Sequence, residues 1–127
     1  MERKRDLNHF RDLEVYQLAF NSAMKIFQIT KSFPPEEKYS LVDQIRRSSR
    51  SVCTNLAEGW RKRKYKAVFV NKLTDSMQEA SETQAWLEFS LSCEYIPNET
   101  FEDLDNEFEI IIKMLNSMEI NAAKFCF

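Results

Sequence analysis

The fold is decided by residues 44–60, which read Gln44-Ile45-Arg46-Arg47-Ser48-Ser49-Arg50-Ser51-Val52-Cys53-Thr54-Asn55-Leu56-Ala57-Glu58-Gly59-Trp60. Within this stretch and just before it, apolar or small side chains recur three and four residues apart. That period is typical of a helix with one buried face. The face consists of Leu41, Val42, Ile45, Ser49, Val52 and Leu56. We therefore expect this helix to be the one around which the others pack.

A second row, which we call the polar seam, lies beside the buried face at the same spacing. It consists of Gln44, Ser48, Ser51, Asn55 and Glu58. An exposed face in so charged a chain would more typically carry Lys and Glu, so this composition favours a contact surface rich in hydrogen bonds. We expect the seam to be buried, with Asn55 bonded to an adjacent helix and Glu58 paired with an arginine. A merely solvated face is the alternative.

Basic residues flank the seam and follow it, and we call them the basic patch. They are Arg46, Arg47, Arg50, Arg61, Lys62, Arg63, Lys64 and Lys66. If the helix is straight, Arg47, Arg50 and Arg61 share one outer face. Positive side chains at reachable spacing can bind phosphates, and the rings of Trp60 and Tyr65 could stack on bases. The pattern favours nucleic-acid binding, although many solvated helices look similar.

The net charge of −2 conceals an asymmetry between the two halves of the chain. Residues 1–66 carry a charge of +7, and residues 67–127 carry −9. Such a separation favours either an anionic partner for the first half or docking of the two halves against each other within one subunit. The sequence leaves both alternatives open.

The chain has 127 residues, with only one Gly and three Pro, so it offers little turn chemistry for β-hairpins. We expect one all-α domain over residues 1–127, an up-down-up-down four-helix bundle with a mobile basic arm at residues 1–9. Asp12 and Asn98 are the expected N-caps of the first and last helices. The expected helices span residues 12–31, 35–59, 66–93 and 98–121, and the chain is expected to fray after Asn121. The second helix is expected to bend or end at Gly59. The expected core row of the last helix consists of Phe101, Leu104, Phe108, Ile111, Leu115, Met118 and Ala122.

The first helix carries two apolar rows, which is more than three partner helices easily cover. We expect one row to face the core, and it consists of Leu13, Tyr16, Phe20, Ala23 and Phe27. The other row consists of Val15, Ala19, Ile26 and Ile29. We expect a subunit interface to supply the remaining cover, and a thick core within one bundle is the alternative. The expected inward row of the third helix consists of Phe69, Leu73, Met77, Ala80, Gln84, Leu87 and Leu91. Trp86 and Phe89 lie off that row and are further candidates for contact with a neighbouring subunit.

The chain is poor in catalytic residues. His9 is its only histidine, and it has no glycine-rich phosphate loop. Cys53, Cys93 and Cys126 lack the paired spacing of a zinc site, so we expect three reduced thiols, with Cys53 and Cys93 packed as small apolar residues. The sequence predicts a non-enzymatic protein without cofactor or metal. With no signal peptide and no apolar run of membrane-spanning length, we expect it in the cytoplasm, away from membranes.

Four segments in order resemble one bacterial family of four-helix bundles. They are residues 10–16 (Phe-Arg-Asp-Leu-Glu-Val-Tyr), Phe33-Pro34, residues 44–47 (Gln-Ile-Arg-Arg) and residues 55–60 (Asn-Leu-Ala-Glu-Gly-Trp). Members of that family are encoded in intervening sequences of large-subunit ribosomal RNA genes, and the accessory proteins of diversity-generating retroelements look like relatives. The resemblance covers residues 10–120. It implies a helical bundle that assembles into a homopentameric ring, without a settled activity.

Two functional hypotheses remain. In the first, the protein is a homo-oligomeric, nucleic-acid-binding accessory factor that binds RNA or DNA and works beside a reverse transcriptase or another protein. In the second, it is a structural or protein-interaction module whose arginines pair with the acidic second half. The salt dependence of any nucleic-acid binding distinguishes the two, because phosphate contacts weaken steeply as salt rises.

Overall fold

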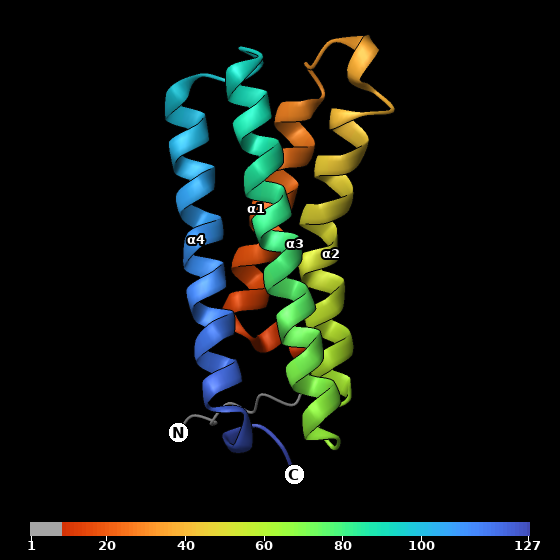
Figure 1. The fold of residues 1–127 in the computed structure, drawn as a ribbon, viewed down its shortest axis with the longest axis vertical. Helices are drawn as coiled ribbons and strands as arrows, with labels where there is room; N and C mark the ends of the chain where they lie inside the picture. The colour runs from red at the N-terminus through yellow and green to blue at the C-terminus, as the bar shows by residue number, and fades with distance from the viewer. Residues whose placement is uncertain (1–8) are drawn as a thin grey trace.

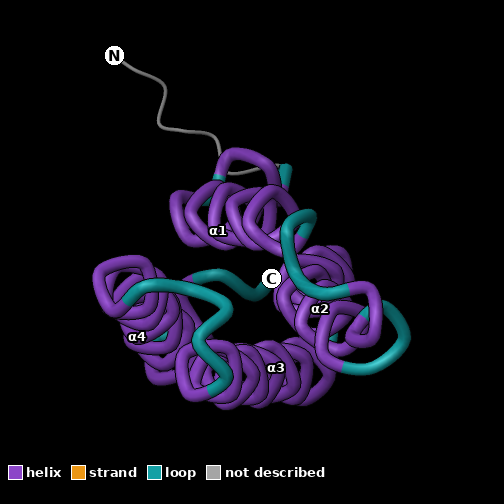
Figure 2. The backbone as a smooth tube through the Cα atoms, turned by 90° about the horizontal axis from the view of Figure 1, so that it is seen from above, coloured by secondary structure: helices purple, strands orange, loops and turns teal. Residues whose placement is uncertain are grey.

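The computed structural model describes residues 9–127, and within that range it contains four α-helices and no β-strand. The helices are α1 (Glu14–Thr30), α2 (Leu41–Arg61), α3 (Lys66–Ser92) and α4 (Asn98–Ile120). They run alternately up and down (Figure 1), and each packs on two neighbours around a common core (Figure 2). The predicted four-helix bundle is confirmed. The basic arm was expected at residues 1–9, and apart from His9 it lies outside the described residues.

The core rows of α3 and α4 carry the clearest periodicity. On α4, Leu104, Phe108 and Ile111 are fully or nearly fully buried, and Leu115 and Met118 continue the row as predicted. On α3 the buried row alternates apolar and small hydroxyl side chains: Phe69, Leu73, Ser76, Ala80, Thr83, Leu87 and Ser90. The hydroxyls replace Met77, Gln84 and Leu91, which were expected to point inward and are half-buried.

The expected core row of α1 is only partly buried: Leu13 and Ala23 are buried, Tyr16 and Phe27 are half-buried, and the second row is buried at Val15, Ala19 and Ile26. The buried positions of the helix are Val15, Ala19, Ser22, Ala23, Ile26 and Thr30. Phe20, which we had placed in the core, is 48% exposed and stacks on Tyr16 with ring centroids 6.1 Å apart. Ala19 and Ser22 are small enough to let α1 approach its neighbours closely, whereas the large ring of Phe20 lies partly exposed outside the core. Periodicity could not separate two rows that are equally apolar.

Both expected N-caps are wrong by one residue. Asp12 belongs to a short 3-10 turn, η1 (Phe10–Asp12), and Leu13 is the N-cap of α1. His9 is the N-cap of η1, and its Nδ1 accepts a hydrogen bond from the Arg11 backbone N–H at 3.2 Å. Pro97 is the N-cap of α4, and Asn98 instead donates a hydrogen bond from its side chain to Glu102 within the helix.

The start of α2 lies six residues later than predicted. The prolines produce only a second 3-10 turn, η2 (Pro35–Glu37), and the helix begins at Leu41. Glu37 links the turn η2 to the start of α2, since its Oε1 accepts hydrogen bonds from Ser40 Oγ (2.7 Å) and the Leu41 backbone N–H (3.4 Å). Its other oxygen accepts from Tyr95 Oη at 2.7 Å, which ties this entry to the α3–α4 turn.

Gly59 was expected to bend or end the second helix, and it does neither. α2 continues to Arg61, and Gly59 does not adopt a positive φ. The glycine is required by close packing instead, because a Cβ at this position would lie 2.7 Å from Cβ of Lys72 on α3. No atom can be added there unless the two helices move apart.

The end of the chain is ordered rather than frayed. A third 3-10 turn, η3 (Ala122–Lys124), follows α4 and places the Phe125 ring 5.8 Å from Trp60 and 6.3 Å from Phe69, centroid to centroid. The aromatic contacts supply the apolar burial that the sequence-based expectation overlooked.

Of the cysteines expected to be packed, Cys53 is buried and Cys93 is exposed. Burial raises the pKa of the Cys53 thiol to about 12, so that thiol stays protonated at neutral pH. None of the helices in residues 9–127 combines the length and the apolar character that crossing a membrane requires.

Candidate nucleic-acid interface

The polar seam begins in the contact between α2 and α3. Ser48 is fully buried, and its Oγ lies 2.8 Å from Thr83 Oγ1 on α3. One turn further along, Ser76 Oγ donates to the backbone carbonyl oxygen of Val52 at 2.6 Å. These contacts confirm a buried, hydrogen-bonded seam at Ser48, and they show why α3 carries hydroxyls on its inner face.

The other half of the seam differs from the expectation. Asn55 is half-buried, but its amide donates to the carbonyl oxygen and hydroxyl of Ser51 on its own helix, at 2.9 and 3.0 Å, and not to an adjacent helix. Glu58 is exposed and pairs with Lys72 on α3 (2.9 Å) rather than with an arginine. Gln44 is half-buried as well. The seam therefore opens towards solvent as α2 approaches its C-terminal end.

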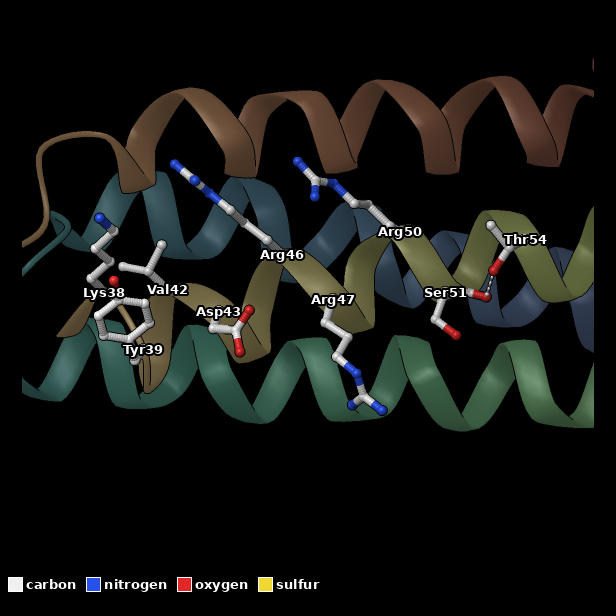
Figure 3. A pocket seen from close by; sticks show the side chains of 9 residues that line it. All are labelled: Lys38, Tyr39, Val42, Asp43, Arg46, Arg47, Arg50, Ser51 and Thr54. Atoms are coloured by element: carbon white, nitrogen blue, oxygen red, sulfur yellow. Dashed lines mark hydrogen bonds between the residues drawn. The ribbon is translucent and has the colours of Figure 1, made fainter.

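A groove of about 630 Å³ runs along the outer flank of α2, and we call it the basic groove (Figure 3). Three arginines of the basic patch contribute to its walls. Arg46 and Arg50 extend towards α1, whereas Arg47 extends towards α3. The lining residues are Lys38, Tyr39, Val42, Asp43, Arg46, Arg47, Arg50, Ser51 and Thr54. The lining thus contains four cationic side chains and one carboxylate, Asp43, which gives the groove a positive potential.

Arg46 is largely committed to the bundle itself. Its Nε donates to Thr30 Oγ1 (2.9 Å), and its guanidinium donates to the carbonyl oxygen of Phe27 (3.3 Å) and lies 4.6 Å from the centre of the Phe27 ring. Thr30 is the last residue of α1, and Arg46 shares with the Thr30 hydroxyl (3.1 Å) a carbonyl of the last helical turn. A cation here is also favoured by the helix dipole.

Arg47 and Arg50 are exposed. The Arg50 guanidinium lies 5.8 Å from the Phe27 ring, at the edge of a cation–π contact. Arg47 acts at longer range on Glu79 of α3: burial raises the pKa of that carboxyl first, the charge of Glu82 raises it further, and the positive charge of Arg47 lowers it. Neither arginine forms an ion pair with any of residues 9–127.

The remainder of the patch lies at the turn between α2 and α3. Arg63 is half-buried there: its Nε donates to the carbonyl oxygen of Trp60 (2.9 Å), and its guanidinium lies 3.8 Å from the centre of the Trp60 ring. Burial is the main reason that the pKa of Arg63 is lowered. Arg61, Lys62, Lys64 and Lys66 are exposed.

The two stacking residues expected from the sequence have different environments. Trp60 is only 3% exposed, so its ring cannot stack on a base, whereas Tyr65 is accessible. The two cationic groups also lie apart, since Arg50 and Arg61 are separated by 11 positions, or roughly 16 Å along the helix. The structure brings Arg46, Arg47 and Arg50 together in the groove, and the cations of the turn stand as a second group at the far end of α2.

Lys38 and Tyr39 belong to the groove and were missed in the sequence. They precede α2, in the segment that was expected to be its first turns, where their side chains would have been assigned to a continuous helix. A signal was present, because a Lys-Tyr pair just ahead of an arginine-rich helix has the same cation-plus-ring character as the patch. Within the part of the chain that the structure describes, no three His, Cys, Asp or Glu side chains gather as a metal site would require.

The fold and the groove together define an all-helical bundle protein with a positively charged flank on its second helix. Residues 11–117 match the family described as 23S rRNA-intervening sequence protein, and the chain belongs to that family. A solved structure with the same fold is a protein of unknown function from the S23 ribosomal protein family of Bacteroides thetaiotaomicron. It is 33% identical, with a TM-score of 0.75, over 83% of this chain and 97% of the other. No curated protein matches the chain significantly.

Proposed function

We propose that the protein is a non-enzymatic, homo-oligomeric accessory factor of the cytoplasm that binds RNA or DNA through the basic groove. The observation that carries this proposal is the state of Arg47 and Arg50, which are exposed and make no ion pair with residues 9–127. If the arginines served to dock the acidic second half of the chain, they would be paired with it. Unpaired guanidiniums are instead available to phosphates.

Assembly into a ring, with five subunits as the resemblance implies, strengthens this proposal. One groove offers only a few phosphate contacts, and the whole chain carries a net charge of −2. Several copies on one assembly would bind a single long polyanion multivalently, which raises the overall affinity without any new contact. Phe20 and Met24 are 48% and 44% exposed on α1 and are the natural candidates for subunit contacts.

The proposal is tested with the double variant Arg47→Gln/Arg50→Gln, which leaves the structural Arg46 and Arg63 in place. We expect weaker binding of a fluorescent RNA in anisotropy titrations, and a fall of roughly 1.4 to 1.8 in the slope of log affinity against log salt for each subunit engaged. The matched control, Lys113→Gln/Lys124→Gln, removes two exposed charges elsewhere and should leave the slope nearly unchanged.

Two results would contradict the proposal. One is an unmodified protein that retains no RNA or DNA at low salt. The other is a double variant that binds normally but melts at a lower temperature, because that result would assign the arginines to contacts within the protein. We also propose that a reverse transcriptase or another protein is a partner. Co-purification with the unmodified protein would identify such a partner, and the double variant serves as the control.

A further inference from the structure

A second hollow of about 480 Å³ adjoins the basic groove at Tyr39, and we call it the aromatic hollow. Tyr39 lines both depressions. The hollow lies between the start of α2 and the last third of α3, where Trp86 and Phe89 form its far wall. The basic groove and the aromatic hollow thus lie side by side and share one lining residue, Tyr39.

From this juxtaposition we propose that the surface selects single-stranded over double-stranded nucleic acid. The phosphates occupy the basic groove, and bases stack on Tyr39 and in the aromatic hollow. This inference rests on the nucleic-acid-binding function proposed above and adds to it the form of the ligand.

The rings of the hollow are accessible. Tyr39 is 83% exposed and Phe89 is 57% exposed. Trp86 is half-buried, and its ring lies 5.7 Å from that of Phe89, centroid to centroid. Its indole N–H donates to Glu82 at 3.1 Å, which holds the ring in place. Exposed rings of this kind are what unpaired bases stack on, whereas the bases of a duplex are already stacked on one another.

Positive charge lies next to the stacking ring. The ammonium of Lys38 is 5.3 Å from the centre of the Tyr39 ring, and Lys38 is a wall of the basic groove. A phosphate bound by Lys38 would therefore carry its base close to Tyr39. Arg47 and Arg50 lie three positions apart, about 4.5 Å along α2, and extend to opposite sides of the groove, Arg50 towards α1 and Arg47 towards α3.

A second copy of the chain is the rival occupant of the aromatic hollow. The hollow itself is lined by one carboxylate, Glu37, and by no cation, so the charge that favours nucleic acid is that of the basic groove, which shares Tyr39 with the hollow and is lined by four cations and one carboxylate. Phe20 and Met24 on α1 offer an alternative subunit contact, and the depression beside Phe20 has one cation in its lining, Arg11. The experiment nevertheless measures both possibilities.

The experiment compares a fluorescein-labelled RNA of about 16 nucleotides with its blunt duplex, in anisotropy titrations of the full chain. We expect the single strand to bind at least about tenfold more tightly. The variant Tyr39→Ala/Phe89→Ala should lose about tenfold or more in affinity for the single strand, and less than about twofold for the duplex. Phe127→Ala, which removes an 81% exposed ring at the end of the chain, is the matched control and should change neither affinity.

Tryptophan fluorescence supplies an independent measurement. Trp60 and Trp86 are the two tryptophans of the chain, and Trp60 is shielded from any ligand. Quenching by the unlabelled single strand must therefore come from Trp86, and it should disappear in the variant Trp86→Phe. Quenching that persists in Trp86→Phe would contradict base stacking in the hollow.

The outcomes separate this inference from the proposed function. If strand and duplex bind equally and Tyr39→Ala/Phe89→Ala changes nothing, the inference is overturned while the proposed function stands. If the variant loses its oligomeric state but keeps its affinity per subunit, the hollow belongs to a second copy and the inference is overturned. If neither RNA binds at low salt, the proposed function fails, and the inference fails with it.

Discussion

Ser48 Oγ and Thr83 Oγ1 lie 2.8 Å apart in the buried contact between α2 and α3, and each of the two residues is fully buried. Ser48 has only a distant second acceptor, the carbonyl oxygen of Ile45 at 3.4 Å, whereas Thr83 also donates to Glu79 O at 2.8 Å. The hydrogen bond between the two hydroxyls is therefore the main one for Ser48, whereas Thr83 keeps a second good partner without it.

The variant Thr83→Val keeps the shape of the side chain and removes its hydroxyl. It should lower the free energy of unfolding by about 1–3 kcal/mol, because Ser48 loses its good partner inside the core. The double variant Ser48→Ala/Thr83→Val should cost less than the sum of the two single changes. Urea denaturation measures all three variants, and strict additivity would show that the two hydroxyls do not interact.

Gly59→Ala should destabilise the protein, contrary to the usual effect in a helix. Replacing glycine by alanine within a helix normally stabilises it by about 0.5–1 kcal/mol. Here the new methyl group would lie 2.7 Å from Lys72 Cβ, so α2 and α3 must separate. Overpacking of this kind costs about 1–3 kcal/mol. A melting temperature above that of the unmodified protein would contradict the close contact.

Arg46 and Arg47 are neighbours in sequence, and their substitutions should have opposite consequences. Arg46→Gln removes the hydrogen bonds to Thr30 and Phe27, and it should reduce stability by about 1–3 kcal/mol with little change in RNA affinity. Arg47→Gln should change stability by less than about 0.5 kcal/mol and weaken RNA binding. Thermal melting measures the stability of both variants, and anisotropy titration measures their RNA affinity. Equal losses of stability and affinity in the two variants would refute the different roles of Arg46 and Arg47.

Acid should selectively weaken the contact between Glu37 and the α3–α4 turn. Hydrogen bonds from Ser40, and then from Tyr95, lower the pKa of Glu37 below its ordinary 4.5. The ionised carboxylate therefore contributes stability above the unfolded-state pKa, and that contribution is lost as pH falls through the folded-state pKa. The difference in melting temperature between the unmodified protein and Glu37→Gln should be largest near neutral pH and should shrink on acidification.

The hydrogen bond between Tyr95 and Glu37 should also be detectable at alkaline pH. The hydrogen bond to Glu37 is the main reason that the pKa of Tyr95 is raised to about 12, from an ordinary 10.0. Because this pKa is raised on folding, the associated stability is complete below about 10 and is lost as pH rises through about 12. Ultraviolet titration of the phenols should show a group that titrates at about 12 and whose pKa falls in Glu37→Gln.

The sequence predicted the parts of the fold in which one physical signal dominated. On α4 the apolar residues form a single row, so periodicity identified Leu104, Phe108 and Ile111 correctly. On α1 two rows were equally apolar, and members of both are buried, so periodicity could not identify the buried face. Hydropathy gives no weight to size, so Phe20 was misplaced and Ser22 was overlooked.

The candidate site was predictable in composition but not in detail. The arginines of α2 were recognisable as a basic flank, yet nothing local indicated that Arg46 would close the end of α1, 16 positions earlier in the chain. Trp60 looked accessible because basic residues follow it, but Phe125 covers it from the other end of the sequence. Contacts between residues so far apart along the chain leave no periodic pattern.

Gly59 also determines how far α2 and α3 can slide past one another. The inner hydroxyls of α3 recur every seven residues, at Ser76, Thr83 and Ser90, so a shift by one heptad would again set a hydroxyl opposite Ser48. Polar pairing alone therefore tolerates more than one register. The position opposite Lys72, by contrast, requires a residue without a side chain, and the chain has a single glycine. Its only glycine thus marks the one alignment in which the two helices close fully.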